Sequence, residues 1–338
     1  MILATILSAL LSQQPAWQPQ AGGTTERLRG VSAVSADVAW ASGNNGTVIR
    51  TADGGKTWAR LPVGGAESLD FRDIEACGAS IAYVLSIGPG DRSRIYKTTD
   101  GGKSWTLQFT NPDPKAFYDA IAFWDVNNGI AVGDPVDGRF TVVRTNDGGA
   151  TWTTVDPAGM PPALEGDGAF AASGTILVTL GRNDAWFGSG GGARARVFHT
   201  RNRGTTWTVA ETPVAAGTAS AGVFSIAFFD QSHGIAAGGD YRKEREPGDN
   251  VALSSDGGAT WTLPAARLRS FRSAVAYVPS GRGETLLAVG PGGSDISRDG
   301  GRTWSPVGDE GFHALGIAPD GTAWAVGEKG AVGKLELR

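Results

Sequence analysis

The stretch Thr145-Asn-Asp-Gly-Gly-Ala-Thr-Trp152 is one copy of an eight-residue motif that recurs along the chain. A degraded copy has Asn202 where the aspartate would stand and Arg203 where the first glycine would stand. The copies occupy residues 51–58, 98–105, 145–152, 200–207, 254–261 and 297–304. A repeat every ~40–50 residues, with short alternating strands and glycine turns between the copies, is typical of the blades of a β-propeller.

A seventh repeat without the motif follows the six copies. The segment 323–327 (Ala-Trp-Ala-Val-Gly) echoes 39–43 (Ala-Trp-Ala-Ser-Gly) of the first repeat, and the chain then stops one strand short of a blade. Residues 17–20 resemble the strand that follows the motif elsewhere, so we expect the N-terminal strand to complete the last blade. Such closure removes an exposed sheet edge. The sequence therefore predicts an all-β, seven-bladed propeller over residues 17–338, with four strands in each blade. The fourth repeat is expected to begin near Gly168.

The motif itself is predicted to be structural. An aspartate in a tight turn accepts hydrogen bonds from nearby backbone amides, and glycine adopts positive φ without a clash. The closing tryptophan is a large apolar group suited to packing between neighbouring blades. A residue that each blade requires belongs to the fold rather than to one catalytic site. This structural role is expected for Asp53, Asp100, Asp147, Asp256 and Asp299.

Composition excludes several classes of function. The chain has 338 residues, a net charge of −4 and 19% charged residues, so it lacks the basic field of a nucleic-acid-binding protein. Cys77 is the single cysteine, and the three histidines are scattered, which predicts no metal site. The glycine-rich loops lack the following helix of a phosphate cradle. We expect a monomer that needs no cofactor.

The first residues form an apolar run. Its length suits the hydrophobic region of a signal peptide, although no basic residue precedes it, the first being Arg27. The run is too short to span a bilayer comfortably. Residues 1–16 are therefore predicted to be a signal peptide, with an apolar tail that packs on the domain as the alternative. The expected location is the periplasm or the outside of the cell, without a transmembrane segment.

Candidate binding residues gather on the face opposite the motif turns. The inner strands begin on that face, and the loops between the second and third strands lie there too. The candidates are Arg29, Arg72, Tyr118, Asp134, Asp240, Tyr241, Arg272 and His313. Each guanidinium offers a planar fork for a carboxylate or phosphate. The alternative is that the arginines pair with acids such as Asp73 or Asp119 and stabilise the rim. Long loops are expected at 181–196, as a flexible arm with Trp186 and Phe187 at its tip, and at 238–250.

Residues 17–338 resemble the photosystem II stability/assembly factor-like group of BNR, or Asp-box, repeat proteins. The resemblance rests on the segment 27–31 (Arg-Leu-Arg-Gly-Val), the segment 40–47 (Trp-Ala-Ser-Gly-Asn-Asn-Gly-Thr) and the repeated motif, which is the Asp box. It implies a seven-bladed propeller whose arginine patch binds a membrane-protein partner. By position, that role falls on Arg29, Arg72 and Arg272.

The sialidase superfamily also carries Asp boxes, but sialidases are six-bladed and need an arginine triad with a Tyr/Glu pair. Here Tyr118 is a candidate, whereas neither Glu165 nor Glu310 has a convincing spacing from it. We therefore expect a non-catalytic binding or assembly factor that docks a polypeptide or anionic partner opposite the Asp boxes. The alternative is a glycoside hydrolase or lyase that acts on a carboxylated sugar in the central pocket.

Overall fold

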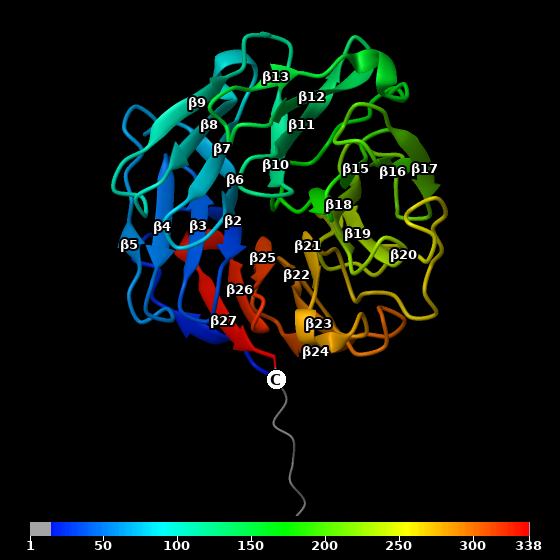
Figure 1. The fold of residues 1–338 in the computed structure, drawn as a ribbon. Coiled ribbons are helices and arrows are strands. Elements are labelled where there is room, and N and C mark those ends of the chain that lie inside the picture. The colour runs from blue at the N-terminus through cyan, green and yellow to red at the C-terminus, as the bar shows by residue number, and fades with distance from the viewer. Residues whose placement is uncertain (1–14, 338) are drawn as a thin grey trace, which may run out of the picture.

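The computed structural model describes residues 15–337, and they form a ring of seven antiparallel sheets around a central axis (Figure 1). Blade 1 contains β2 (Leu28–Ala33), β3 (Ala39–Gly43), β4 (Thr47–Thr51) and β5 (Ala59–Arg60). Blade 2 contains β6 (Asp70–Ala76), β7 (Ala82–Ile87), β8 (Arg94–Thr98) and β9 (Thr106–Thr110). Blade 3 contains β10 (Tyr118–Phe123), β11 (Gly129–Val136), β12 (Arg139–Thr145) and β13 (Thr153–Thr154).

The second half of the ring repeats this order. Blade 4 contains β14 (Leu177–Leu180), β15 (Asp184–Ser189), β16 (Ala195–Thr200) and β17 (Thr208–Thr212). Blade 5 contains β18 (Ala221–Phe228), β19 (Gly234–Asp240) and β20 (Val251–Ser254), and its fourth strand is reduced to a single bridge between Leu253 and Thr262. Blade 6 contains β21 (Ala274–Tyr277), β22 (Leu286–Gly290), β23 (Gly293–Ser297) and β24 (Ser305–Gly308). Blade 7 contains β25 (Ala314–Ile317), β26 (Thr322–Val326), β27 (Val332–Glu336) and β1 (Gln18–Gln20).

The helical elements of residues 15–337 are five single 3-10 turns. They are η1 (Gly90–Arg92), η2 (Pro157–Gly159), η3 (Tyr241–Lys243), η4 (Pro279–Gly281) and η5 (Glu328–Gly330). In this part of the chain, no helix combines the length and the apolar character that crossing a bilayer requires. Residues 1–14, which carry most of the predicted signal peptide or apolar tail, lie outside the described residues.

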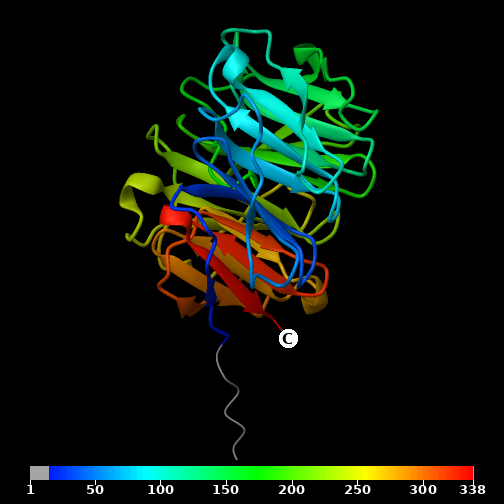
Figure 2. The ribbon, with the colours of Figure 1, turned by 90° about the vertical axis from the view of Figure 1, so that its left-hand side faces the viewer.

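The N-terminal strand closes the ring, as predicted. Strand β1 runs antiparallel to β27, with Gln18 opposite Lys334 and Gln20 opposite Val332. Figure 2 shows the blue N-terminal segment beside the red C-terminal strand. Trp17, just before β1, donates through Nε1 to Ser294 Oγ at 2.8 Å and so ties blade 7 to blade 6. Its ring packs on Phe312, with the ring centroids 4.9 Å apart.

The Asp box makes the local hydrogen bonds expected of it. Asp53 Oδ1 accepts the Thr57 backbone N–H at 2.9 Å, and Oδ2 accepts the Thr57 hydroxyl at 2.6 Å. These bonds from Thr57 lower the pKa of Asp53 to about 2. In the degraded box, Asn202 Oδ1 accepts the Thr206 backbone N–H at 2.9 Å in the same way. The neutral amide of Asn202 therefore accepts the same backbone hydrogen bond as the aspartate carboxylate of the intact boxes.

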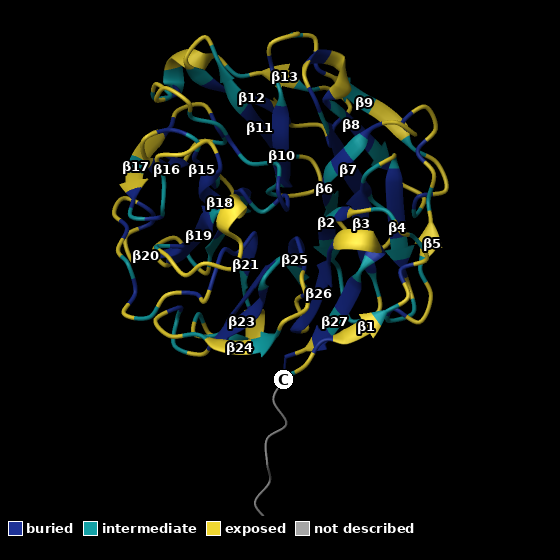
Figure 3. Cartoon of the chain, turned by 180° about the vertical axis from the view of Figure 1, so that it is seen from behind, coloured by how far each residue is buried: buried dark blue, intermediate teal, exposed yellow. Residues whose placement is uncertain are grey.

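Box tryptophans pack between blades. Trp58 of blade 1 lies edge-on to Trp324 of blade 7, with ring centroids 5.6 Å apart and planes at 82°. Trp105 of blade 2 meets Trp40 of blade 1 in the same manner, at 6.3 Å and 85°. Edge-to-face contacts of this kind stabilise a pair beyond the area that it buries. Burial follows the same plan, because the middle strands are buried while exposed residues gather on the outer strands and the turns (Figure 3).

Two expectations for blade 4 are wrong, one on a loop and one on the start of its inner strand. Trp186 and Phe187 are not the tip of a flexible arm but fully buried residues of β15, where Trp186 stacks on Phe228 at a centroid distance of 3.9 Å. The inner strand starts at Leu177, nine residues beyond the predicted start near Gly168. The long connection is instead residues 155–176, between β13 and β14.

Candidate functional site

A cavity of about 490 Å³ opens on the face where the inner strands begin, opposite the Asp boxes. We call it the mouth. Its polar lining is Arg27, Arg29, Arg72, Asp119, Asp134, Glu244, Ser273, His313 and Glu328, and its aromatic lining is Phe117, Phe170, Phe224, Tyr241 and Phe271. Five of the eight predicted binding residues therefore meet there: Arg29, Arg72, Asp134, Tyr241 and His313. A concave site with aromatic walls and a few converging charges is the usual form of a binding pocket.

Arg29 is the least satisfied charge of the mouth. It lies in β2, its Nε is buried without a hydrogen-bond partner, and its guanidinium forms no ion pair within residues 15–337. Burial, together with the neighbouring charges of Arg72 and Arg27, lowers its pKa to about 9. A largely desolvated guanidinium without a direct ion pair is unfavourable, and the charges of Asp70 and Glu328 offset this only in part. An anion in the mouth would relieve this cost.

The other two arginines are partly engaged. Arg72 donates from Nε to Asp70 Oδ2 at 2.8 Å and from Nη1 to the Ala171 carbonyl at 3.0 Å. Arg27 pairs with Glu328 at 2.6 Å in a half-exposed position. Exposed pairs of this kind contribute only about 0–1 kcal/mol, so they exchange readily for another anion.

His313 completes the rim beside Arg29. Its Nε2 lies 2.8 Å from Glu328 Oε1. Burial, reinforced by the nearby charge of Arg29, lowers the pKa of His313 to about 4 in spite of that carboxylate. The imidazole is therefore neutral at pH 7, and the positive charge of the mouth comes from its arginines.

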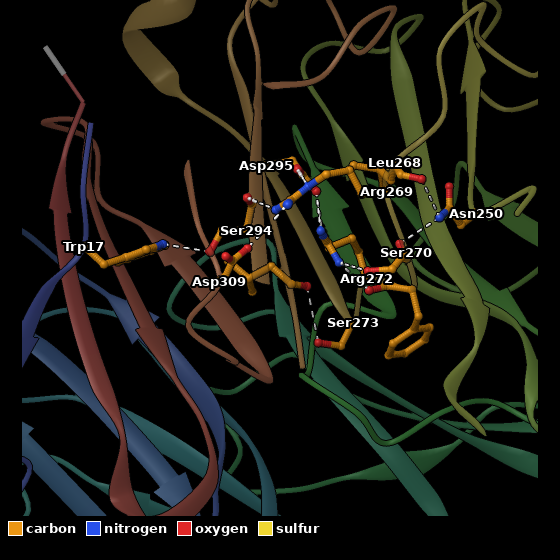
Figure 4. A network of polar contacts seen from close by, with 12 residues as sticks. Trp17, Asn250, Leu268, Arg269, Ser270, Arg272, Ser273, Ser294, Asp295 and Asp309 are labelled. Atoms are coloured by element: carbon orange, nitrogen blue, oxygen red, sulfur yellow. Dashed lines mark hydrogen bonds and ion pairs between the residues drawn. The ribbon is translucent and has the colours of Figure 1, made fainter. Parts of the chain in front are cut away.

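Arg272 does not line the mouth. Its side chain is wholly buried and donates from Nε to Asp295 Oδ2 at 2.9 Å, and from Nη1 to Ser270 Oγ at 2.7 Å (Figure 4). Asp295 belongs to β23 and is equally buried. The alternative of an internal ion pair thus describes Arg272, although its partner is Asp295 rather than the acids considered from the sequence.

Tyr118 and Asp240 also lie outside the lining of the cavity. Tyr118 is buried in β10 against Phe109, and burial raises the pKa of its hydroxyl to about 12. Asp240 caps η3 by accepting the Arg242 backbone N–H at 2.9 Å.

The glutamates considered for a sialidase-type pair are not in the mouth either. Both Glu165 and Glu310 are exposed and absent from the cavity lining, whereas Tyr118 is buried. The mouth therefore does not bring Tyr118 together with either of these glutamates, although Tyr241 and Glu244 both line it.

The predicted binding residues include Asp134 but not its neighbour in the mouth, Asp119, which the sequence analysis considered as a partner for arginine. Asp119 is 1% exposed and its Oδ2 accepts no hydrogen bond. Burial and the nearby Asp134 raise the pKa of Asp119 well above its usual value, and burial raises the pKa of Asp134 to about 6. In β6, outside the cavity lining, burial raises the pKa of Asp73 to about 7. The sequence did offer a signal for Asp119, because it is a polar residue near the start of an inner strand, where side chains can face the channel.

Comparison with known proteins supports the repeat and the fold. The family model of the BNR/Asp-box repeat matches residues 295–306. A sequence search of curated proteins finds no match. The structure of YCF48 bound to D1 peptide superposes with a TM-score of 0.66 at 19% identity, covering 96% of this chain and 100% of that one. YCF48 from Cyanidioschyzon merolae gives 0.64 at 17% identity, covering 95% of this chain and 99% of that one.

A GH74 xyloglucanase from Xanthomonas campestris is also similar, with a TM-score of 0.65 at 17% identity. The match covers 94% of this chain but 53% of the xyloglucanase chain. The comparisons therefore show a propeller with the fold of YCF48 and a BNR/Asp-box repeat at residues 295–306.

Proposed function

We propose that this propeller is a non-catalytic docking protein that binds an anionic segment of a polypeptide partner in the mouth. The observation that carries the proposal is the unpaired guanidinium of Arg29, flanked by Arg27 and Arg72. Arginine forks suit carboxylates, and the aromatic wall suits apolar side chains beside them. The fold shared with YCF48, which has been solved with a peptide bound, supports a polypeptide as the ligand.

The test begins with capture of partners from native membranes on the immobilised protein. Overlapping peptides of the recovered proteins are then measured by fluorescence anisotropy against the wild type and the double variant Arg29→Ala/Arg72→Ala. We expect the wild type to bind, and we expect its binding to weaken as the salt concentration rises, because salt screens the attraction between charges. The double variant should not bind. The matched control is Arg60→Ala, an exposed arginine of the outer strand β5. Equal binding by wild type and double variant would exclude the mouth as the docking site.

A glycoside hydrolase or lyase remains the second candidate, because Asp119 and Asp134 place two acids with raised pKa values in one cavity. A retaining glycosidase needs two carboxyl groups about 5–5.5 Å apart and open to the sugar. The near-complete burial of Asp119 disfavours that role. A screen for hydrolysis or cleavage of uronate and sialoside substrates tests this second candidate. Turnover that Asp134→Asn abolishes would support the enzyme and overturn the non-catalytic proposal.

We also propose that the protein is exported and acts as a monomer. The apolar run within residues 1–16 motivates the first statement. Mass spectrometry of protein purified from the native host should find a chain that starts near residues 13–17 in the periplasm or the medium. An intact Met1 in the cytosol would contradict export. Sedimentation velocity should give the mass of a single propeller.

A further inference from the structure

A segment of blade 4 crosses the mouth and forms its floor. We call residues 167–174 the strap; they belong to the long connection between β13 and β14 (Figure 1). Four consecutive strap residues, Ala169, Phe170, Ala171 and Ala172, line the cavity. The strap leaves its own blade and contacts blades 2, 3, 5 and 6, so it lies across the channel that the ring encloses.

The strap is anchored firmly where it begins. Asp167 forms an ion pair with Arg196 of β16, and both side chains are almost fully buried. Gly168 exchanges two backbone hydrogen bonds with Gly190, at 2.8 and 3.0 Å. Gly166 just before the anchor has a φ of +78°, a conformation that glycine adopts readily.

The middle of the strap is held by the charged groups of the mouth. The Ala169 N–H donates to Asp134 Oδ1 at 2.9 Å, and the Ala171 carbonyl accepts from Arg72 Nη1 at 3.0 Å. Phe170 stacks on Phe224, with ring centroids 4.0 Å apart and planes at 8°. The strap therefore occupies the same arginine that an anionic partner would need.

The strap ends at a second glycine. Ser173 Oγ donates to the Ser273 carbonyl at 2.9 Å, and Gly174 follows with a φ of +79°. A Cβ on Gly174 would lie 2.2 Å from Asp73 Oδ1, so the strap passes directly over that buried carboxyl group. Thr175, beyond this hinge, is fixed to blade 5 through Ser225 Oγ at 2.7 Å.

We propose that the strap is a displaceable closure, which separates the mouth from the buried acids beneath it in the free protein and is lifted between Gly166 and Gly174 when an anionic partner takes Arg72 from the Ala171 carbonyl. The competition part of this inference rests on the function proposed above, whereas the opening of the strap does not. The exchange is favourable because a carboxylate is a stronger acceptor for guanidinium than a neutral carbonyl.

The closed strap also carries an electrostatic cost that opening relieves. It helps to bury Asp119 of β10, Asp134 of β11 and Asp73 of β6. The positive group that acts on Asp119 is Arg72, itself paired with Asp70, whereas the acidic neighbour of Asp73 is Glu75 of the same strand. Burial raises the pKa of each of the three acids, to about 6 for Asp134 and about 7 for Asp73, so these two are partly or largely protonated under the strap near pH 6. Lifting the strap would let water reach these carboxyl groups, which would lower their pKa values and favour their ionised forms.

Hydrogen–deuterium exchange of the free protein tests the opening. The strap should exchange at least about 100-fold faster than β14 and β15, because local opening needs less free energy than global unfolding. Exchange of the strap at the same rate as those strands would overturn the inference.

A cross-link tests the competition. In a Cys77→Ser background, which removes the one free thiol, Asp134→Cys/Gly168→Cys should fix the strap to blade 3. A Cβ on Gly168 would lie 3.8 Å from Asp134 Cγ, a spacing that a small shift converts to a disulfide. The oxidised lock should slow strap exchange at least about tenfold and weaken binding of a hexaglutamate peptide by about as much, and reduction should restore both. Equal binding by the oxidised and reduced forms would overturn the competition.

The matched control is Thr175→Cys/Ser225→Cys, whose cross-link lies beyond the Gly174 hinge and should leave strap exchange unchanged. Where the lock fails to form, Phe170→Ala replaces it, because loss of the Phe224 stack should accelerate exchange of the strap alone; unchanged exchange would overturn the inference. Suppose that hexaglutamate and all partner peptides fail to bind the reduced protein while the strap still exchanges faster than its neighbours. The proposed function and the competition for Arg72 would then be refuted, whereas the local opening of the strap would still be supported.

Discussion

Arg272 and Asp295 form an ion pair that has no contact with solvent, and Arg272 Nε lies 2.9 Å from Asp295 Oδ2. We predict that Arg272→Ala destabilises the propeller by about 3 kcal/mol, because it removes the buried partner of Asp295 and leaves that carboxylate to the half-exposed Arg269, whose Nε lies 2.7 Å from Oδ1. The comparison is Arg29→Ala, which removes an unpaired cation and should leave stability unchanged or raised. Urea denaturation of both variants measures the difference. Similar midpoints for the two variants would contradict the distinction between scaffold and mouth.

Closure of the ring depends on Trp17. We expect Trp17→Ala to destabilise the protein by about 3–5 kcal/mol, because it removes a buried indole together with its bond to Ser294. Gln18→Ala, one residue later and exposed, is the control and should change the melting temperature little. Differential scanning calorimetry of the two variants provides the measurement. A wild-type melting temperature for Trp17→Ala would show that blade 7 holds without this contact.

The degraded box predicts which substitutions the intact boxes tolerate. At pH 7, Asp100→Asn should lower the melting temperature only slightly, because the amide of Asn202 already accepts the equivalent backbone hydrogen bond in the degraded box. Asp100→Ala, which removes this acceptor, should lower the melting temperature more. The hydrogen bonds from Ser104 lower the pKa of Asp100 to about 2. The carboxylate therefore contributes stability above about pH 4, and the contribution is lost as the pH falls towards 2. Thermal melts from pH 2 to 7 should show Asp100→Asn approaching the wild type in acid.

Asp134 gives the opposite pH dependence. Burial raises its pKa from the ordinary 3.8 to about 6, so the folded protein favours the protonated form. Stability is then greatest below about pH 4 and falls as the pH rises through 6. Asp134→Asn keeps the acceptor for the Ala169 N–H but cannot ionise, so it should gain about 2 kcal/mol relative to the wild type between pH 4 and 7. Loss of the Asp134 charge also lowers the pKa of Asp119, and this adds to the gain in the same direction. If the difference in unfolding free energy between the two proteins stayed constant from pH 4 to 7, the raised pKa of Asp134 would be refuted.

The sequence was sufficient for the architecture because each Asp box fixes one turn of one blade. The repeated turn set the strand order, and the truncated seventh repeat at the C-terminus implied that the segment after Trp17 completes it, which β1 does. The same regularity misled the interpretation of blade 4. The predicted inner strand near Gly168 is the strap, whose short polar and apolar residues resemble a strand. Contacts with four other blades hold it across the channel, and no local pattern encodes those contacts.

The orientation of side chains at the mouth was only partly predictable. Arg29 and Arg72 reach the cavity as expected, but Arg272 turns inward because Asp295 of β23 offers a buried carboxylate beside it. In a blade whose two faces are both covered, a period of two does not tell which face a polar residue occupies. The partner of a buried charge depends on long-range packing, which a sequence repeat does not specify.

The pairing of Gln20 with Val332 joins one of the first strands that the ribosome produces to the last. Blades 1 to 6 can collapse during translation, but the circle can close only when residues 332–336 have emerged. Until then the nascent chain carries two unpaired strand edges, which are the features most prone to association with other chains. A truncation that removes only β27 would leave those edges open permanently. Its effect should therefore be aggregation or degradation of the whole ring rather than loss of one blade.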